Sequence, residues 1–160
     1  MLYLALKTLH VIAVTMFLGN IATGIFWKEH ADRTREPRLI AHALAGIIAS
    51  DRLFTVPGVL LITVAGITAA IVGHIPILGT GWVLWGIVLF TLSGVAFMGW
   101  VAPLQKRMLT LMQLGAETGN PDWATYAKLS RAWAVWGAVA LILPLLVLTL
   151  MVFKPPMRGL

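Results

Sequence analysis

His10 is the side chain in this sequence best suited to chemistry inside a membrane. It stands about eight residues into the first apolar stretch, which places it about 12 Å along a helix axis. A polar ring at such a depth is costly in hydrocarbon and usually faces the interior of a helix bundle. Neutral imidazole is also a common ligand of haem iron. His10 is therefore a candidate haem ligand, and the alternative is a structural histidine bonded to a neighbouring hydroxyl or carbonyl group.

The helical face that carries His10 leaves room for a flat cofactor. This face is apolar, with small residues at Ala13 and Gly24. A second axial ligand is harder to find, because the residues expected at the same depth in the other helices are not strong ligands. His74 is expected on the same side of the membrane but nearer the surface, which makes it the weaker candidate. A haem held here is expected to be five-coordinate or to take His74 as its other ligand.

A second group of polar residues is expected at the other side of the membrane. Asp51 and Arg52 open an apolar stretch, with Thr55 one helical turn beyond Asp51. An acidic side chain near a helix start can cap exposed N–H groups and match the helix dipole. Residues expected at a similar depth define a candidate polar network: Asn20, Asp51, Arg52, Thr55, Trp100 and Gln105. The network is interpreted either as capping, with Arg52 reaching the interface, or as a proton relay or the polar end of a pocket.

The composition of the chain requires a membrane around these residues. Of the 160 residues, 59% are hydrophobic and only 11% are charged, against about 25% charged in a soluble domain. The absence of cysteine excludes disulfides, iron–sulfur clusters and thiolate chemistry. The charged residues behind the net charge of +6 lie mainly in short connections. They therefore indicate membrane topology and contact with anionic lipid, and not nucleic-acid binding. No hydrolase triad, phosphate-binding loop, dinucleotide motif or zinc motif is present.

Four stretches are long and apolar enough to cross a bilayer as helices, which takes about 20 residues. They predict a single all-α domain over residues 1–160, a polytopic transmembrane antiparallel four-helix bundle. The expected helices cover about residues 2–27, 52–73, 81–114 and 125–153. Arg38–Ser50, between the first two spans, is expected to form an extra interfacial helix or the start of a long second helix. Pro144 is expected to kink the fourth helix and to free the carbonyl group of Ala140.

The basic residues predict the orientation of the bundle. Nine of the twelve Lys and Arg residues fall in the first and third connections or beside them, and the others are Lys7, Lys154 and Arg158. Cytoplasmic loops carry the excess of Lys and Arg, so both long connections are expected in the cytoplasm and both termini outside. We therefore expect a multi-pass protein of the bacterial cytoplasmic (inner) membrane.

Two segments of the chain resemble known bacterial families. Leu6–Ile12, followed by Gly19, is similar to the opening helix of HemJ-type protoporphyrinogen oxidases and of CopD copper-resistance proteins. Asp51–Gly58, with matching positions up to Met108, more closely resembles a bacterial family of predicted integral membrane proteins catalogued as a domain of unknown function. In the HemJ-type enzymes the matching histidine of the first helix is associated with haem b and activity. The resemblance thus implicates His10 alone.

The residues and the resemblance lead to three hypotheses. The first is a haem b-binding membrane protein, with His10 as the iron ligand and a redox or electron-transfer role. HemJ-type enzymes carry a further lysine and a histidine pair where this chain has Trp82–Gly86 and Met98–Trp100. The second hypothesis is a non-enzymatic structural or partner subunit, and the third is a small-solute or metal permease. Expected partners are the lipid bilayer and either a second copy of the chain or a membrane redox protein.

Overall fold

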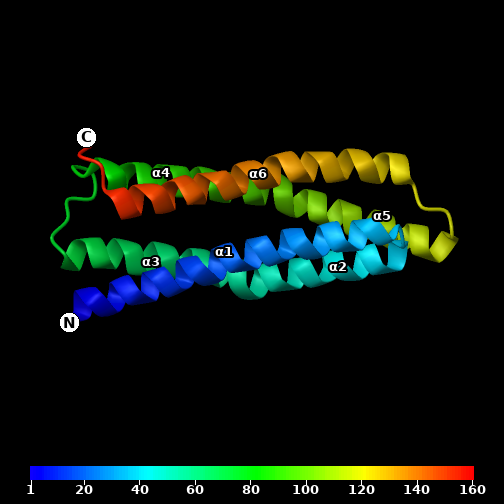
Figure 1. Cartoon of the computed structure of the whole chain (residues 1–160), viewed down its shortest axis with the longest axis horizontal. Helices are drawn as coiled ribbons and strands as arrows, with labels where there is room; N and C mark the ends of the chain where they lie inside the picture. The colour runs from blue at the N-terminus through cyan, green and yellow to red at the C-terminus, as the bar shows by residue number, and fades with distance from the viewer.

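The computed structural model describes all 160 residues, and it consists of helices joined by short connections. In chain order these are α1 (Leu2–Thr34), α2 (Pro37–Ser50), η1 (Asp51–Thr55), α3 (Val56–Val72), α4 (Gly81–Ala96), η2 (Phe97–Val101), α5 (Ala102–Thr118) and α6 (Trp123–Phe153). The segments η1 and η2 are single π-helical turns. The chain therefore forms four long rods, α1, α2–η1–α3, α4–η2–α5 and α6, which lie side by side in Figure 1. The predicted all-α class is confirmed.

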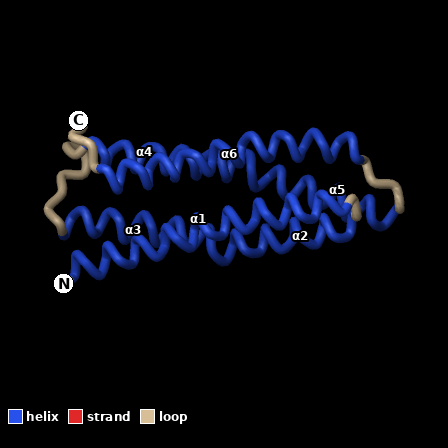
Figure 2. Tube along the Cα trace, in the orientation of Figure 1, coloured by secondary structure: helices blue, strands red, loops and turns tan.

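Each rod is long enough and apolar enough to cross a bilayer. The rods have 31 to 38 residues, which corresponds to about 47–57 Å of helix, against a hydrocarbon core of about 30 Å. Each rod therefore extends beyond the hydrocarbon. Figure 2 shows both chain termini and the α3–α4 connection at one end of the molecule, called here the termini end. The α1–α2 turn and the α5–α6 connection lie at the opposite end, the loop end.

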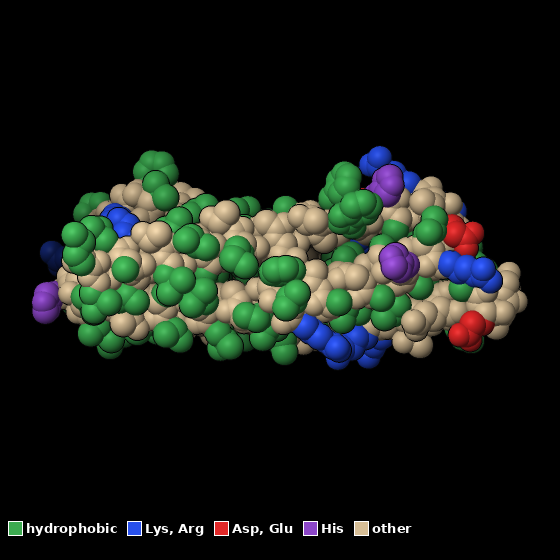
Figure 3. Space-filling model, turned by 90° about the horizontal axis from the view of Figure 1, so that it is seen from below, with side chains coloured by type: hydrophobic (Ala, Val, Ile, Leu, Met, Phe, Trp, Pro, Cys, Tyr) green, Lys and Arg blue, Asp and Glu red, His purple; other side chains and the backbone are tan.

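Acidic and hydrophobic side chains are distributed unevenly along the long axis. On the face shown in Figure 3, hydrophobic side chains cover the termini end and the middle of the molecule, whereas the acidic side chains lie at the loop end. This is the distribution expected of a bundle whose loop end projects from the lipid into water.

The helix boundaries follow from local chemistry. The backbone of Arg35, which ends α1, is left-handed at φ 55°, and Pro37 starts α2 where its missing N–H costs nothing. Asp122 caps α6 by accepting a hydrogen bond of 2.9 Å from the backbone N–H of Thr125. Arg38–Ser50, for which an interfacial helix was one expectation, is the start of the long second rod, because α2 continues through η1 into α3.

Each of the two middle rods contains a π-helical turn that ends two residues before a proline. At η1 the backbone N–H of Val56 bonds the carbonyl group of Asp51, and η2 repeats this pattern. Pro57 and Pro103 then open α3 and α5. A proline has no N–H for the carbonyl group four residues before it, and the wider turn accommodates this loss while the helix continues.

The two ends of the bundle pack differently. Toward the loop end all four rods contribute to one core of 11 buried residues, which includes Leu44, Met108 and Trp133. Toward the termini end the rods form two pairs, in which α1 packs along α3 and α4 packs along α6. The pairs meet at an edge-to-face contact between Phe17 and Phe90, with ring centres 5.7 Å apart. The space between the two pairs is the candidate functional site.

Candidate functional site

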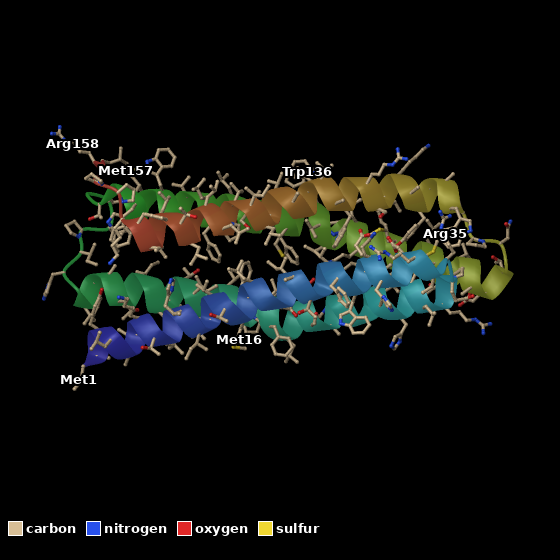
Figure 4. The ribbon with its side chains drawn as sticks, in the orientation of Figure 1. Met1, Met16, Arg35, Trp136, Met157 and Arg158 are labelled. Atoms are coloured by element: carbon tan, nitrogen blue, oxygen red, sulfur yellow. The ribbon has the colours of Figure 1, made fainter.

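A cavity of about 730 Å³ lies between the α1–α3 pair and the α4–α6 pair at the termini end. All four helices line it, and most of its lining residues are hydrophobic. Figure 4 places Met16 near the middle of the molecule and Met157 at the termini end, so the part of α1 before Met16 lies alongside the cavity. Sites for cofactors and small molecules typically have about 300–1,000 Å³ and apolar walls with a few polar groups. The cavity fits this description.

His10 contributes an imidazole to the α1 side of the cavity. Its Nδ1 atom lies 2.8 Å from the backbone carbonyl oxygen of Ile62 on α3. A carbonyl oxygen can only accept, so in the neutral ring Nδ1 carries the proton and Nε2 keeps a free lone pair. Metal-bound histidines are commonly held in this way, by an Nδ1–H that donates to a backbone carbonyl group while Nε2 binds the metal.

Gly66 allows the His10 ring to lie against α3. A Cβ atom at Gly66 would stand 2.9 Å from both Nδ1 and Cε1 of His10. Such a contact is shorter than packed atoms tolerate, so any larger residue would displace the ring from the Ile62 carbonyl group. Gly66 therefore helps to fix the orientation of the imidazole, and it also lines the cavity.

Met151 brings a second donor atom to the cavity from the other helix pair. It lies on α6 beside Gly86 of α4, where an added Cβ atom would stand 2.8 Å from the Met151 methyl carbon. Both residues line the cavity. A methionine thioether is an axial ligand of haem iron in some cytochromes. Met151 was not among the ligands expected from the sequence, because a hydropathy pattern does not show a cavity between helix pairs.

The structure does not bring His74 to the cavity. His74 follows α3 in a left-handed conformation, φ 54°, and its side chain is exposed. It is not among the residues that line the cavity, so the expectation that it could serve as a second ligand has no geometric support. No group of three or more His, Asp or Glu side chains is arranged to hold a metal ion. His10 is therefore the only imidazole at the cavity.

Four residues of the expected polar network lie together around η1. The buried carboxylate of Asp51 accepts hydrogen bonds from Asn20 Nδ2 at 3.2 Å, Thr55 Oγ1 at 2.8 Å and Gln105 Nε2 at 3.1 Å. Asn20 also donates to the hydroxyl oxygen of Thr55 at 2.9 Å. These bonds join α1, η1 and α5. Because Asp51 forms no ion pair, three neutral donors alone satisfy its carboxylate.

Arg52 and Trp100 lie outside this network. Arg52 is exposed and forms no ion pair. As the residue next to Asp51 it points roughly 100° away around the helix. Trp100 is 42% exposed and stacks on Trp136, with ring centres 4.3 Å apart. Helical depth alone placed these two side chains with Asp51, but their direction around the helix axis separates them from it.

A second buried polar cluster was not expected from the sequence. Lys28 is only 1% exposed, and its Nζ atom lies 2.5 Å from both Asp32 Oδ2 and Ser130 Oγ. The Tyr126 hydroxyl donates to the other oxygen of Asp32, and Lys28 Nζ lies 5.1 Å from the centre of the Trp133 ring. The only signal in the sequence is the i, i+4 spacing of Lys28 and Asp32, which equally fits an exposed pair. The cluster ties α1 to α6 toward the loop end.

Comparison with known proteins gives one match. Residues 4–155 match a family described as predicted integral membrane protein (DUF2269). No curated protein and no solved structure matches the chain. The resemblance to a family of predicted integral membrane proteins of unknown function is therefore confirmed, and it covers nearly the whole chain.

Proposed function

Because this chain belongs to the DUF2269 family of predicted integral membrane proteins, we propose that it acts inside the bilayer by binding haem b in the cavity at the termini end. Nε2 of His10 is the iron ligand in this proposal. The observation that carries it is the hydrogen bond from His10 Nδ1 to the Ile62 carbonyl oxygen. This bond holds the ring at the cavity wall, and in the neutral ring it leaves the Nε2 lone pair free to bind iron.

The chemistry of the cavity fits a porphyrin. A porphyrin is flat and largely apolar, and the cavity is an apolar space between two helix pairs. Gly66 and Gly86 keep side-chain bulk away from its opposite sides. Met151 offers a second donor atom, of a type that binds haem iron. When bound, a haem supplies one-electron chemistry, and the protein then serves as an oxidoreductase or an electron-transfer partner.

The absorption spectrum of the full-length protein tests this function. The protein is expressed with ample haem, purified in mild detergent and measured oxidised and reduced. We expect a Soret band that shifts on reduction, and a loss of haem of roughly tenfold or more in His10→Ala. His74→Ala is the matched control and keeps its haem, because His74 is exposed and lies outside the cavity. A wild-type protein without a Soret band would overturn the function, and full haem content in His10→Ala would overturn the ligand assignment.

The proposal includes an orientation in the bacterial cytoplasmic membrane. Nine of the twelve Lys and Arg residues fall within residues 28–52 and 106–131, the two parts of the chain that contain the α1–α2 and α5–α6 connections, so the loop end faces the cytoplasm. The chain has no cysteine, which makes single-cysteine labelling of intact cells straightforward. A membrane-impermeant maleimide is expected to label His74→Cys in the α3–α4 connection but not Asn120→Cys in the α5–α6 connection. The opposite labelling pattern contradicts this orientation.

A non-enzymatic partner subunit is the second candidate function. The packed core toward the loop end and the two buried polar clusters there favour it, because they are features of a rigid scaffold. On this reading His10 only joins α1 to α3. His10→Ala then lowers the thermal stability in detergent without any spectral change, which distinguishes the two functions in the same preparation.

A further inference from the structure

The cavity is lined by two cations and no anion. Lys7 on α1 and Lys154 at the end of α6 are the only formally charged residues among those that line it. They belong to opposite helix pairs, and each lies near a chain terminus. The ammonium group of Lys154 lies 5.4 Å from the centre of the Trp82 ring, and Trp82 also lines the cavity. The aromatic face attracts the cation but does not neutralise it.

Neither lysine has an acidic partner within the protein. The only ion pair in the structure joins Lys28 to Asp32 on α1. None of the acidic residues lies in α3, α4, α6 or the α3–α4 connection; they are Glu29, Asp32, Glu36, Asp51, Glu117 and Asp122. Figure 3 shows the acidic side chains of its face at the end away from the termini. The termini end therefore carries positive charge at an apolar cavity without any side-chain counter-charge.

We propose that Lys7 and Lys154 bind the acidic groups of the molecule that occupies the cavity. The ligand is then an amphiphile, with carboxylate or phosphate groups at the termini end and a large apolar body between the helix pairs. The inference deepens the proposed function and rests on it where the ligand is haem b. The two propionates of haem meet the two lysines, while His10, about 4.5 Å further along α1 than Lys7, reaches the iron.

An anionic lipid shares this chemistry, so the experiment has two arms. In the first arm the haem-free full-length protein, in nanodiscs of phosphatidylcholine, is titrated with ferric haem and with its dimethyl ester, and the Soret band is followed. The double variant Lys7→Gln/Lys154→Gln is expected to bind haem about tenfold more weakly than the wild type, but to bind the ester equally well. Lys106→Gln, on α5 and outside the cavity, is the matched control and binds haem like the wild type.

The second arm measures which lipid stays with the protein. Wild type, control and double variant are extracted from vesicles of equal phosphatidylglycerol and phosphatidylcholine and examined by native mass spectrometry. Retention of phosphatidylglycerol by the wild type and the control, but not by the double variant, supports the lysine site with a lipid as its ligand. Thermal unfolding in the same nanodiscs shows that the variants are folded, and the two single variants replace the double variant if it is not.

The outcomes separate the inference from the proposed function. Equal haem affinity in the wild type and the double variant, with the ester bound as tightly as haem, overturns the inference and leaves the function standing. A wild type that binds no haem overturns the function, and the lipid arm then decides the inference. In that case, equal retention of phosphatidylglycerol by the double variant, or no enrichment in any protein, overturns the inference as well.

Discussion

The hydroxyl group of Ser93 on α4 donates a hydrogen bond of 2.6 Å to the backbone carbonyl oxygen of Ala140 on α6. Both residues are buried. Pro144 lies four residues beyond Ala140 and has no N–H to offer this carbonyl group. The serine of one helix thus replaces the backbone donor that the proline removes from another, and it joins the two helices of the α4–α6 pair.

Ser93→Ala is expected to lower the free energy of unfolding by about 1 kcal/mol, because it leaves the Ala140 carbonyl group unpaired in an apolar setting. Pro144→Ala restores the backbone N–H, so the same serine substitution should cost much less in that background. Unfolding of the four proteins of this double-mutant cycle in detergent measures the difference. Equal losses in both backgrounds would show that the carbonyl group does not depend on Ser93.

Gly66→Ala is expected to weaken haem binding by roughly tenfold. The new methyl group would stand 2.9 Å from the His10 ring and would move the imidazole away from the Ile62 carbonyl group. Gly94→Ala, on α4, is the matched control, because no atom lies within 4 Å of its added Cβ. Titration followed at the Soret band compares the two variants. If Gly66→Ala binds haem as tightly as wild type, the ring orientation does not matter for the ligand.

Asp51→Asn is expected to lower the free energy of unfolding by about 2 kcal/mol. The amide that replaces the carboxylate turns an N–H group toward the donors of Asn20, Thr55 and Gln105, which need an acceptor. Arg52→Gln, at the adjacent exposed position, is expected to leave the stability unchanged. Thermal unfolding in detergent compares both with the wild type. An unaltered midpoint for Asp51→Asn would show that the network does not hold α1, η1 and α5 together.

Lys28→Met is expected to lower the free energy of unfolding by about 3 kcal/mol, since it leaves Asp32 without its cation. Lys28→Met/Asp32→Leu removes both charges and should recover part of this loss. Lys128→Met, at an exposed position of α6, is the control for the loss of a lysine. Denaturant titration in detergent gives the values. A double variant less stable than Lys28→Met alone would show that the carboxylate stabilises α1 through Tyr126 and not through the lysine.

The capping of α6 predicts a pH dependence. Hydrogen bonds from the Thr125 side chain and backbone lower the pKa of Asp122 below its ordinary value. The charged carboxylate therefore favours the folded state above the ordinary carboxyl pKa, and this contribution is lost as the pH falls through the lowered pKa. Asp122→Ala should lower the unfolding temperature at neutral pH, and its difference from the wild type should shrink in strong acid. A difference that is independent of pH would contradict this role of the carboxylate.

Hydropathy and length were sufficient to predict the four membrane-crossing rods. They were not sufficient for the helix ends. The first helix was expected to end near residue 27, but α1 continues to Thr34, because Lys28 is buried against α6 and Asp32, which is half-buried, bonds to it and to Tyr126 of α6. A hydropathy pattern reads such charges as the start of a loop. It cannot show that another helix satisfies them.

The sequence predicted how deep in the membrane the residues of the candidate site lie, but not the direction in which their side chains point. The position of His10 within an apolar stretch indicated a ring that faces protein, whereas its partner is the backbone carbonyl group of Ile62, which no sequence pattern marks. The cavity depends on two helix pairs that stay apart, and this is a property of packing between distant segments. Arg52 and Trp100 failed to join Asp51 for the same reason, since depth along a helix says nothing about its rotation.

The two π-helical turns explain how such rotations are set. An extra residue in a turn shifts the phase of a helix by roughly 100°, so α2 packs on α5 as well as on α1, whereas α3 packs on α1. In the third rod α4 packs on α6, while α5 packs on both α2 and α6. The number of residues in these turns thus sets how the half of each rod at one end of the molecule is rotated relative to the half at the other end. A deletion of one residue within η1 or η2 would be absorbed, because the π-helical turn would become an α-helical one, whereas the same deletion elsewhere in the rod would turn every later side chain of that rod away from its neighbours.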